Sequence, residues 1–117
     1  MLDMHFYTRN NLQNSIDMSE QLFKEISKTE ISRLDYHEYC LIVDEEEYTV
    51  NAVELKFNNR VNIVRILCEI LVDKINSIEI DENPNIKELR EVFDDCKVLA
   101  KLIAMIEDDK NIYFSYE

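Results

Sequence analysis

Two residues have the spacing of half a zinc site, and a cysteine beside a histidine could also act as a nucleophile: His37 and Cys40. Structural zinc needs four closely spaced ligands, and the remaining candidates are only His5, Cys68 and Cys96. The last two lie in apolar stripes, where we expect them to behave as small buried hydrophobes. No third group that would orient a Cys40–His37 pair is apparent. We therefore expect neither a metal site nor a catalytic cysteine.

A second group of residues, Asp81, Asn83 and Asn85, matches the first three ligand positions of a calcium-binding EF-hand loop. The match ends there, because Ile86 stands where the loop needs glycine and Val92 stands where a bidentate glutamate should close the site. The beginning of a helix within an acidic turn explains the same residues. We expect no metal and no cofactor.

The absence of glycine from all 117 residues argues against nucleotide-binding enzymes. Phosphate loops and dinucleotide folds use glycine where backbone N–H groups approach an anion closely. Adjacent carboxylates such as Asp94 and Asp95 are weak evidence for acid–base catalysis, because neighbouring residues on a helix point apart. Direct nucleic-acid binding depends on Lys and Arg, which are scarce in the acidic segments. We expect a protein that is not an enzyme and that does not bind nucleic acid directly.

The distribution of charge is the feature that most suggests a function. The chain has 13 basic and 25 acidic residues, which gives a net charge of −12. The segments 30–54 and 79–95 have net charges of −7 and −5, so they hold the whole excess. Solubility of a small domain needs a net charge of magnitude only about 2 to 8. Charge this strong and this clustered is typical of a surface that binds a basic partner.

The candidate partner-binding residues are carboxylates within these two segments. We expect Glu88, Glu91 and Asp95 to follow one face of a helix, opposite its apolar stripe, so that they resemble a row of phosphates. A dense acidic surface speeds encounter with a basic protein and competes with its natural polyanion. The full set is Asp44, Glu45, Glu46, Glu47, Glu82, Glu88, Glu91, Asp94 and Asp95.

In size and charge, the chain is similar to toxin-immunity proteins and to phage-encoded inhibitors that mimic DNA, although it shares no motif with them. The similarity implies an inhibitor that occludes the nucleic-acid-binding surface of a basic partner, such as a nuclease. The alternative is a helical adaptor or oligomeric scaffold that binds through apolar helix faces. A third interpretation is that the charge only keeps the protein soluble.

Hydrophobic periodicity predicts an α+β fold with three helices, at about 11–28, 60–77 and 84–107. Asn10 or Asn11 would cap the first helix, and Asn83 would cap the last, with Pro84 at its first position. A short connection makes the last two helices an antiparallel hairpin. An all-α bundle is the alternative.

Strands are expected at 3–8 and 112–116, where apolar and aromatic residues alternate with polar ones. The segment 38–57 is ambiguous. Clustered Tyr, Thr and Val favour a β-hairpin with Asp44–Glu47 at its tip, whereas the capping-box-like spacing of Asp44 and Glu47 would suit a helix. We favour the hairpin, packed with the other strands in a small antiparallel sheet.

The two later helices carry apolar stripes with a 3-4-3-4-3 spacing. An intramolecular core is favoured over a long dimeric coil, because each stripe lasts under three heptads. Leu67, Leu71, Phe93 and Cys96 are accordingly expected in the core. The stripes are Val61, Val64, Cys68, Leu71, Ile75 and Ile78 in the first of these helices, and Ile86, Leu89, Phe93, Cys96, Ala100 and Ile103 in the second.

Length and composition predict one domain spanning residues 1–117, either monomeric or homodimeric. No apolar run approaches the roughly 20 residues that a bilayer requires, so no membrane partner is expected. The first residues do not have a basic segment followed by an apolar one, as a signal peptide would. We expect a cytoplasmic protein whose three cysteines stay reduced.

Overall fold

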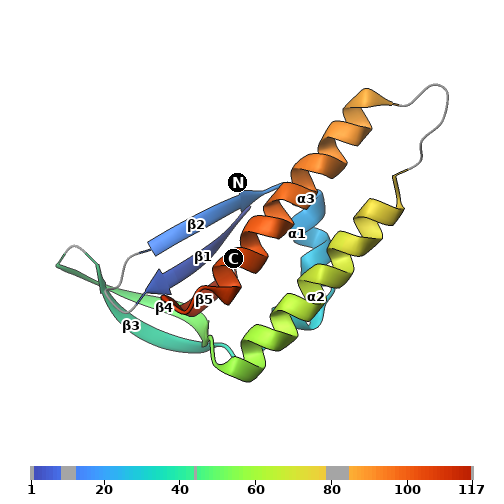
Figure 1. Cartoon of the computed structure of the whole chain (residues 1–117). Helices are drawn as coiled ribbons and strands as arrows, with labels where there is room; N and C mark the ends of the chain where they lie inside the picture. Colours follow the sequence, from blue (N-terminus) through green and yellow to red (C-terminus); the bar gives the residue numbers. More distant parts are fainter. Residues whose placement is uncertain (1, 9–12, 44, 79–84, 117) are drawn as a thin grey trace.

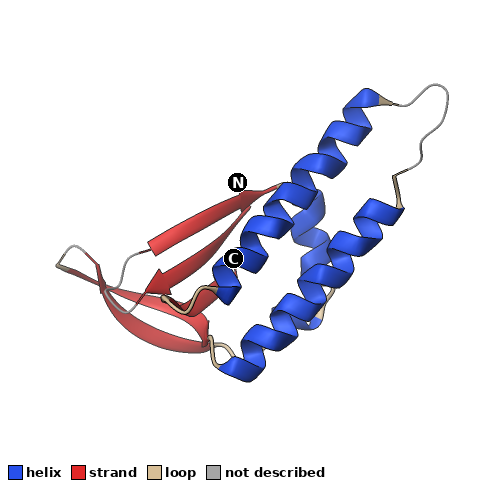
Figure 2. Ribbon diagram, viewed as in Figure 1, coloured by secondary structure: helices blue, strands red, loops and turns tan. Residues whose placement is uncertain are grey.

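Five strands form one antiparallel sheet in the order β2-β1-β5-β4-β3, and the helices pack on one side of it (Figures 1 and 2). This computed structural model describes residues 2–8, 13–43, 45–78 and 85–116. The predicted α+β fold is confirmed. The strands are β1 (Leu2–Thr8), β2 (Gln13–Met18), β3 (His37–Val43), β4 (Glu46–Glu54) and β5 (Asn111–Tyr116). The helices are α1 (Glu20–Ser27), α2 (Phe57–Asn76) and α3 (Ile86–Glu107), with a short 3-10 turn, η1 (Glu30–Arg33).

The C-terminal strand β5 lies at the centre of the sheet, between β1 and β4. Phe6 of β1 stands opposite Phe114 of β5, and their ring centroids are 5.3 Å apart. Val53 of β4 stands opposite Phe114 on the other side. All three side chains are buried in the core beneath the helices. The expected strands at both ends of the chain and the expected hairpin at 38–57 are therefore confirmed.

The predicted first helix, 11–28, is wrong in its N-terminal half. Residues 13–18 form the edge strand β2, because Ile16 and Met18 alternate with exposed polar residues and turn toward the core. The helix begins only after Ser19, whose hydroxyl caps it by accepting a hydrogen bond from the Leu22 N–H at 3.1 Å. Asn10 and Asn11, the predicted caps, lie outside the described residues.

Helices α2 and α3 form the antiparallel hairpin that the sequence predicts, and their ends at Asn76 and Glu107 agree with it. The cap of α3 is Asn85, whose side chain accepts from the Glu88 N–H at 3.2 Å; Asn83 and Pro84 lie outside the described residues. At the other end of α3, the Arg60 guanidinium donates to the carbonyl oxygens of Ile106 and Asp108 at 2.6 and 3.1 Å. Arg60 thereby satisfies carbonyls that the end of a helix leaves unpaired.

The core-facing stripes of α2 and α3 differ from the predicted ones. In the buried face of α2, Ile63, Ile66 and Leu67 contact the core, and in α3 Leu99, Leu102 and Ile106 do so. Of the four residues predicted in the core, only Leu67 is buried, whereas Leu71 and Cys96 are half-buried and Phe93 is 52% exposed. The stripes that the sequence predicts for the core therefore lie on the exposed and half-buried sides of the two helices.

Candidate partner-binding surface

The β3–β4 hairpin, here called the acidic arm and defined as residues 35–54, projects from one end of the molecule (Figure 1). No Lys or Arg occurs between Arg33 and Lys56. The described carboxylates of the arm are all exposed, and only His37 and Lys56 form ion pairs with any of them, at Asp35 and Glu54. The exposed carboxylates are Asp35, Glu38, Glu45, Glu46, Glu47 and Glu54.

The tip of the arm holds the predicted site residues Glu45, Glu46 and Glu47, while Asp44 lies outside the described residues. Glu45 has φ 66°, in the left-handed region that glycine usually fills in tight hairpins. Glu46 accepts a hydrogen bond from the Tyr48 hydroxyl, and Glu47 accepts one from the Cys40 thiol at 2.7 Å. Because successive residues of a strand point to opposite faces, Glu46 and Glu47 place charge on both faces of the arm.

The base of the arm is fixed to the central strand of the sheet. Tyr39 of β3 contacts Tyr113 of β5, with ring centroids 4.5 Å apart, and the Ser115 hydroxyl donates to the Asn51 carbonyl at 3.0 Å. Leu41 and Ala52 are buried on the arm, although the helices lie on the other side of the sheet. These contacts fix the base of the arm to the central strand, from which the tip projects.

The second acidic segment does not form the predicted row of carboxylates. Glu88, Glu91 and Asp94 are exposed on α3, but Lys87 directly precedes Glu88 and Arg90 stands between Glu88 and Glu91. Glu82 lies outside the described residues. Within α3 the acidic residues are therefore nearly balanced by basic ones, which also include Lys97 and Lys101.

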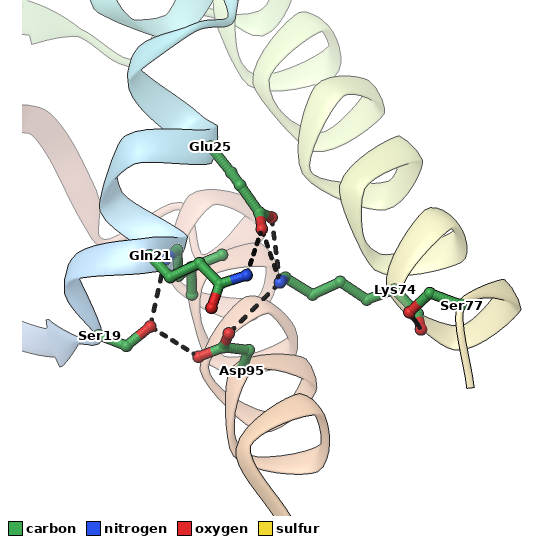
Figure 3. A network of polar contacts seen from close by, with 7 residues as sticks. Ser19, Gln21, Glu25, Lys74, Ser77 and Asp95 are labelled. Carbon is green, nitrogen blue, oxygen red and sulfur yellow. Dashed lines mark hydrogen bonds and ion pairs between the residues drawn. The ribbon is translucent and has the colours of Figure 1, made fainter. Parts of the chain in front are cut away.

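Asp95 is a correction to the candidate list, because it is buried rather than presented to a partner. It lies on the same face of α3 as Leu99, Leu102 and Ile106, not opposite the core. The Ser19 hydroxyl donates to Asp95 Oδ1 at 2.9 Å, and Lys74 Nζ lies 3.3 Å from Asp95 Oδ2 (Figure 3). Asp95 therefore joins the start of α1 to α2 and α3.

Lys74 is the centre of this polar network, and its side chain is only 10% exposed. Its Nζ also lies 3.0 Å from Glu25 Oε2 on α1 (Figure 3). Burial opposes the charged form of the lysine, but hydrogen bonds and charge from Glu25 and Asp95 outweigh burial and raise the pKa of Lys74 above its usual value. The ammonium group therefore stays charged at neutral pH and bridges three helices.

The tip of the acidic arm and the first turn of α3 lie at opposite ends of a molecule with principal extents of 56 × 28 × 22 Å (Figure 1). The tip of the arm points away from the helices, whereas α3 begins at the far end of the helical hairpin. The glutamates at the tip of the arm, residues 45–47, therefore do not share one surface with Glu88 and Glu91 in the first turns of α3. The acidic arm is the candidate site that keeps its predicted residues together.

The residues considered for metal binding or catalysis do not converge. His37 and Cys40 are separated by an odd number of positions on β3, so their side chains point to opposite faces of the strand. The hydrogen bond to Glu47 is the main cause that raises the pKa of the Cys40 thiol, which disfavours the nucleophilic thiolate. All three cysteines are free, and no cluster of metal-ligating side chains occurs among the described residues. Cys68 is exposed, contrary to the prediction that it is buried.

A pair of carboxylates on the sheet was missed by sequence reasoning, because one of its members had been assigned to a helix. Asp3 of β1 stands directly opposite Asp17 of β2. A hydrogen bond with Asp3 and the charge of Asp3 raise the pKa of Asp17 above its usual value. Asp3 Oδ1 is buried and has no hydrogen-bond partner within the described structure. Like charges facing each other across strands destabilise a sheet.

Replacing Asp17 with asparagine should raise the melting temperature at pH 7 but not at pH 3. Because the Asp17 pKa is raised in the folded state, the folded state binds this proton more tightly than the unfolded state does. Stability then falls as the pH rises above the ordinary aspartate pKa of about 3.9, and asparagine removes that loss. Thermal melts between pH 3 and pH 7 measure this, with Asp109→Asn in an exposed turn as the control. A lower melting temperature for Asp17→Asn at pH 7 would contradict the prediction.

Comparison with models of protein families, with curated proteins and with solved structures finds no match to this chain. No helix in the described part of the chain combines the length and the apolar character needed to cross a membrane.

Proposed function

We propose that the protein is a small acidic inhibitor that binds a basic partner protein through the acidic arm and occludes the partner's nucleic-acid-binding surface. The observation that carries the proposal is the composition of the arm, where six exposed carboxylates occur without a lysine or arginine. The partner is expected to be a nuclease or another nucleic-acid-binding enzyme, as in immunity or anti-defence systems. The protein itself is expected to carry out no catalysis and to contact no nucleic acid.

Electrostatics supports the arm as the contact surface. Carboxylates that no neighbouring Lys or Arg offsets attract a basic surface over roughly a Debye length, about 8 Å at physiological salt. Such steering raises association rates by about 10- to 1000-fold and falls steeply with ionic strength. Elsewhere, acidic side chains are more often offset by basic ones, as in the pairs Lys24–Glu20 and Arg65–Glu69. The arm is thus the part of the described chain where negative charge is least compensated.

Rigidity is the second argument for the arm. Binding costs less when a loop does not have to be ordered, because each immobilised side chain or loop residue loses conformational entropy. The contacts of Tyr39 with Tyr113 and of Ser115 with Asn51 already hold the arm on the sheet. Ile42 and Tyr48, which are 60% and 47% exposed near the tip, add apolar surface beside the carboxylates. A basic groove lined with apolar side chains is the kind of surface that fits this tip.

Reversing the charge of the tip, with Glu45→Lys, Glu46→Lys and Glu47→Lys combined, is expected to slow association with the partner by about tenfold or more. The matched control reverses the three exposed carboxylates of α3, with Glu88→Lys, Glu91→Lys and Asp94→Lys combined. This second variant changes the net charge equally but should alter binding far less. Asp95 is left unchanged in both variants because it is buried.

The measurement uses a panel of basic nucleases and DNA-binding proteins, each immobilised and tested at low and high salt. The wild-type protein should bind at least one of them with strong salt dependence, and labelled duplex DNA should compete with it for the same site. If both triple variants bind as tightly as the wild-type protein, or if DNA does not compete, the inhibitor proposal is wrong.

A second candidate function, a helical adaptor, is favoured by a different observation. Val61, Ile75 and Phe93 are each more than half exposed on α2 and α3, outside the acidic arm. An adaptor would bind through these apolar helix faces, with little dependence on salt. The salt titration described above therefore separates the two functions.

A further inference from the structure

The outer face of the α2–α3 hairpin carries two apolar stripes that nothing in the described part of the chain covers. Six of the eight large hydrophobic side chains that are exposed belong to α2 or α3. The repeat along each stripe is seven residues, as in the seam of a coiled coil. We call this surface the hairpin face and define it by Val61, Cys68 and Ile75 on α2 and by Ile86, Phe93 and Ala100 on α3, all of them exposed.

Each of the two helices therefore has two apolar faces. One face of α2, with Ile63 and Leu67, is buried in the core, while half-buried Val64 and Leu71 connect it to the hairpin face. A helix that is apolar over most of its circumference is normally covered on all of those sides. The second face is the stripe with the more regular 3-4 spacing, yet the fold of a single chain does not bury it.

We propose that a second copy of this chain covers the hairpin face, so that two α2–α3 hairpins form an antiparallel four-helix bundle. A stripe with a heptad repeat on both helices of a hairpin is self-complementary under a two-fold axis, since the apolar residues of one copy pack between those of the other. With the axis parallel to the helices, α2 of each copy lies against α3 of the other at the same level.

Charge complementarity supports this occupant and its orientation. The Lys74–Asp95 ion pair, at 3.3 Å, fixes the levels of α2 and α3 relative to each other. Counting along the antiparallel helices from that pair, Glu69 lies at the level of residues near Lys101. A shallow hollow around Cys68 and Val72 is bordered by Arg65, Glu69 and Asp73, with a net charge of −1.

A second shallow hollow lies on α3 around Phe93 and Ala100. It is bordered by Arg90, Asp94 and Lys97, with a net charge of +1. The proposed two-fold axis brings the acidic border of one copy against the basic border of the other. Glu69 of one copy then lies opposite Lys97 and Lys101 of the second. The alternative axis, perpendicular to the helices, would instead place like borders together.

The size of the hairpin face is sufficient for a specific dimer. Helix α2 has 20 residues, and a rise of 1.5 Å per residue makes the face about 30 Å long. Two helices packed 8–10 Å apart, with their side chains, span about 20 Å. The footprint is therefore on the order of 600 Å² per copy, at the lower end of the range for specific interfaces.

Sedimentation equilibrium of the full chain tests the proposal. The wild-type protein should be a dimer at about 50 µM, and Phe93→Glu should weaken self-association by about thirtyfold or more, as expected for a central aromatic. Ile42→Glu on the acidic arm is the matched control, because Ile42 is also exposed but lies outside the hairpin face. Far-UV circular dichroism of dilute Phe93→Glu should match the wild-type spectrum. A monomeric wild-type protein, or a dimer that Phe93→Glu leaves intact, would overturn the proposal.

Charge exchange tests the orientation within the dimer. Glu69→Lys alone should weaken the dimer by about threefold to tenfold, because lysine would then face Lys97 and Lys101 of the second copy. Adding Lys97→Glu and Lys101→Glu to Glu69→Lys should restore most of the lost affinity. Additive weakening by the three substitutions would rule out the α2-against-α3 arrangement. The triple variant of the acidic arm should dimerise like the wild-type protein, so failure of this proposal is separate from failure of the proposed function.

Discussion

Replacing Lys74 with methionine is expected to lower the free energy of unfolding by about 3 kcal/mol. Methionine keeps much of the aliphatic volume but removes the charge that balances Asp95 and Glu25. The Asp95 side chain is only 11% exposed, so water cannot replace the ammonium group. Removing one partner of a buried ion pair costs more than the pair itself contributes, because the remaining charge stays buried and uncompensated.

The destabilisation should be reversed largely by a second change, Asp95→Leu. A buried ion pair replaced by well-packed apolar groups of similar size is often close to neutral in stability. Chemical denaturation of Lys74→Met, Asp95→Leu and the double variant measures the coupling energy. Lys110→Met, in an exposed turn, is the control for loss of positive charge. Equal destabilisation by Lys74→Met and Lys110→Met would show that the network contributes nothing.

The ion pairs of Lys74 also make the free energy of unfolding depend on pH. The pKa of Lys74 is raised in the folded state, so its contribution is complete below the ordinary lysine pKa of about 10.4 and is lost as the pH rises through the folded-state value. The difference in stability between wild-type and Lys74→Met protein should therefore shrink only in strongly alkaline solution.

Much of the fold is predictable from the sequence because its elements have one strong periodicity each. Asn111–Tyr116 alternates as a strand does, and α2 and α3 have apolar residues at helical spacing over five turns or more. For the segment 38–57, residue type favours the correct structure. Its Tyr, Thr and Val residues favour strands, although its three successive glutamates would also suit the start of a helix. Such local signals do not depend on where an element packs.

The first helix was predicted too long because helical and strand periodicities overlap around Ile16. A helical stripe through Ile16 and Phe23 also passes through Ser19, which in the structure is the cap that separates β2 from α1. The decisive information is the pairing of β2 with β1, for example Met4 opposite Ile16. Pairing between strands is a tertiary contact that periodicity within one segment does not reveal.

The misplaced core has a different cause, since α2 and α3 each carry two apolar faces. The sequence shows both faces equally well, and the more regular heptad stripe is the exposed one. A polar residue marks the true core face in each helix: Lys74 in α2 and Asp95 in α3. Pattern reasoning assigns such residues to the surface, because a buried charge is acceptable only when a partner from another helix is present.

For the candidate site, charge density along the sequence identified the acidic arm but overestimated α3. In the arm, every described acidic residue is exposed, because a two-stranded element has little interior in which to bury a charge. On α3, the sequence could not distinguish Asp94 from Asp95, although one is exposed and the other bridges three helices. The two residues differ only in the tertiary structure, where α1 packs against the α2–α3 hairpin and covers Asp95 but not Asp94.

Replacing Leu99 with alanine should lower the free energy of unfolding by about 3 kcal/mol, within the 2–5 kcal/mol range for buried leucines. Leu99 is completely buried in the core beneath the helices, so its removal loses apolar contacts and leaves a cavity that rigid neighbours cannot fill. Ile42→Ala is the control, because Ile42 is 60% exposed on the acidic arm and its loss should change stability by about 0.5 kcal/mol or less. Urea unfolding followed by circular dichroism measures both. Equal midpoints for the two variants would mean that α3 does not pack on the sheet through the Leu99 face.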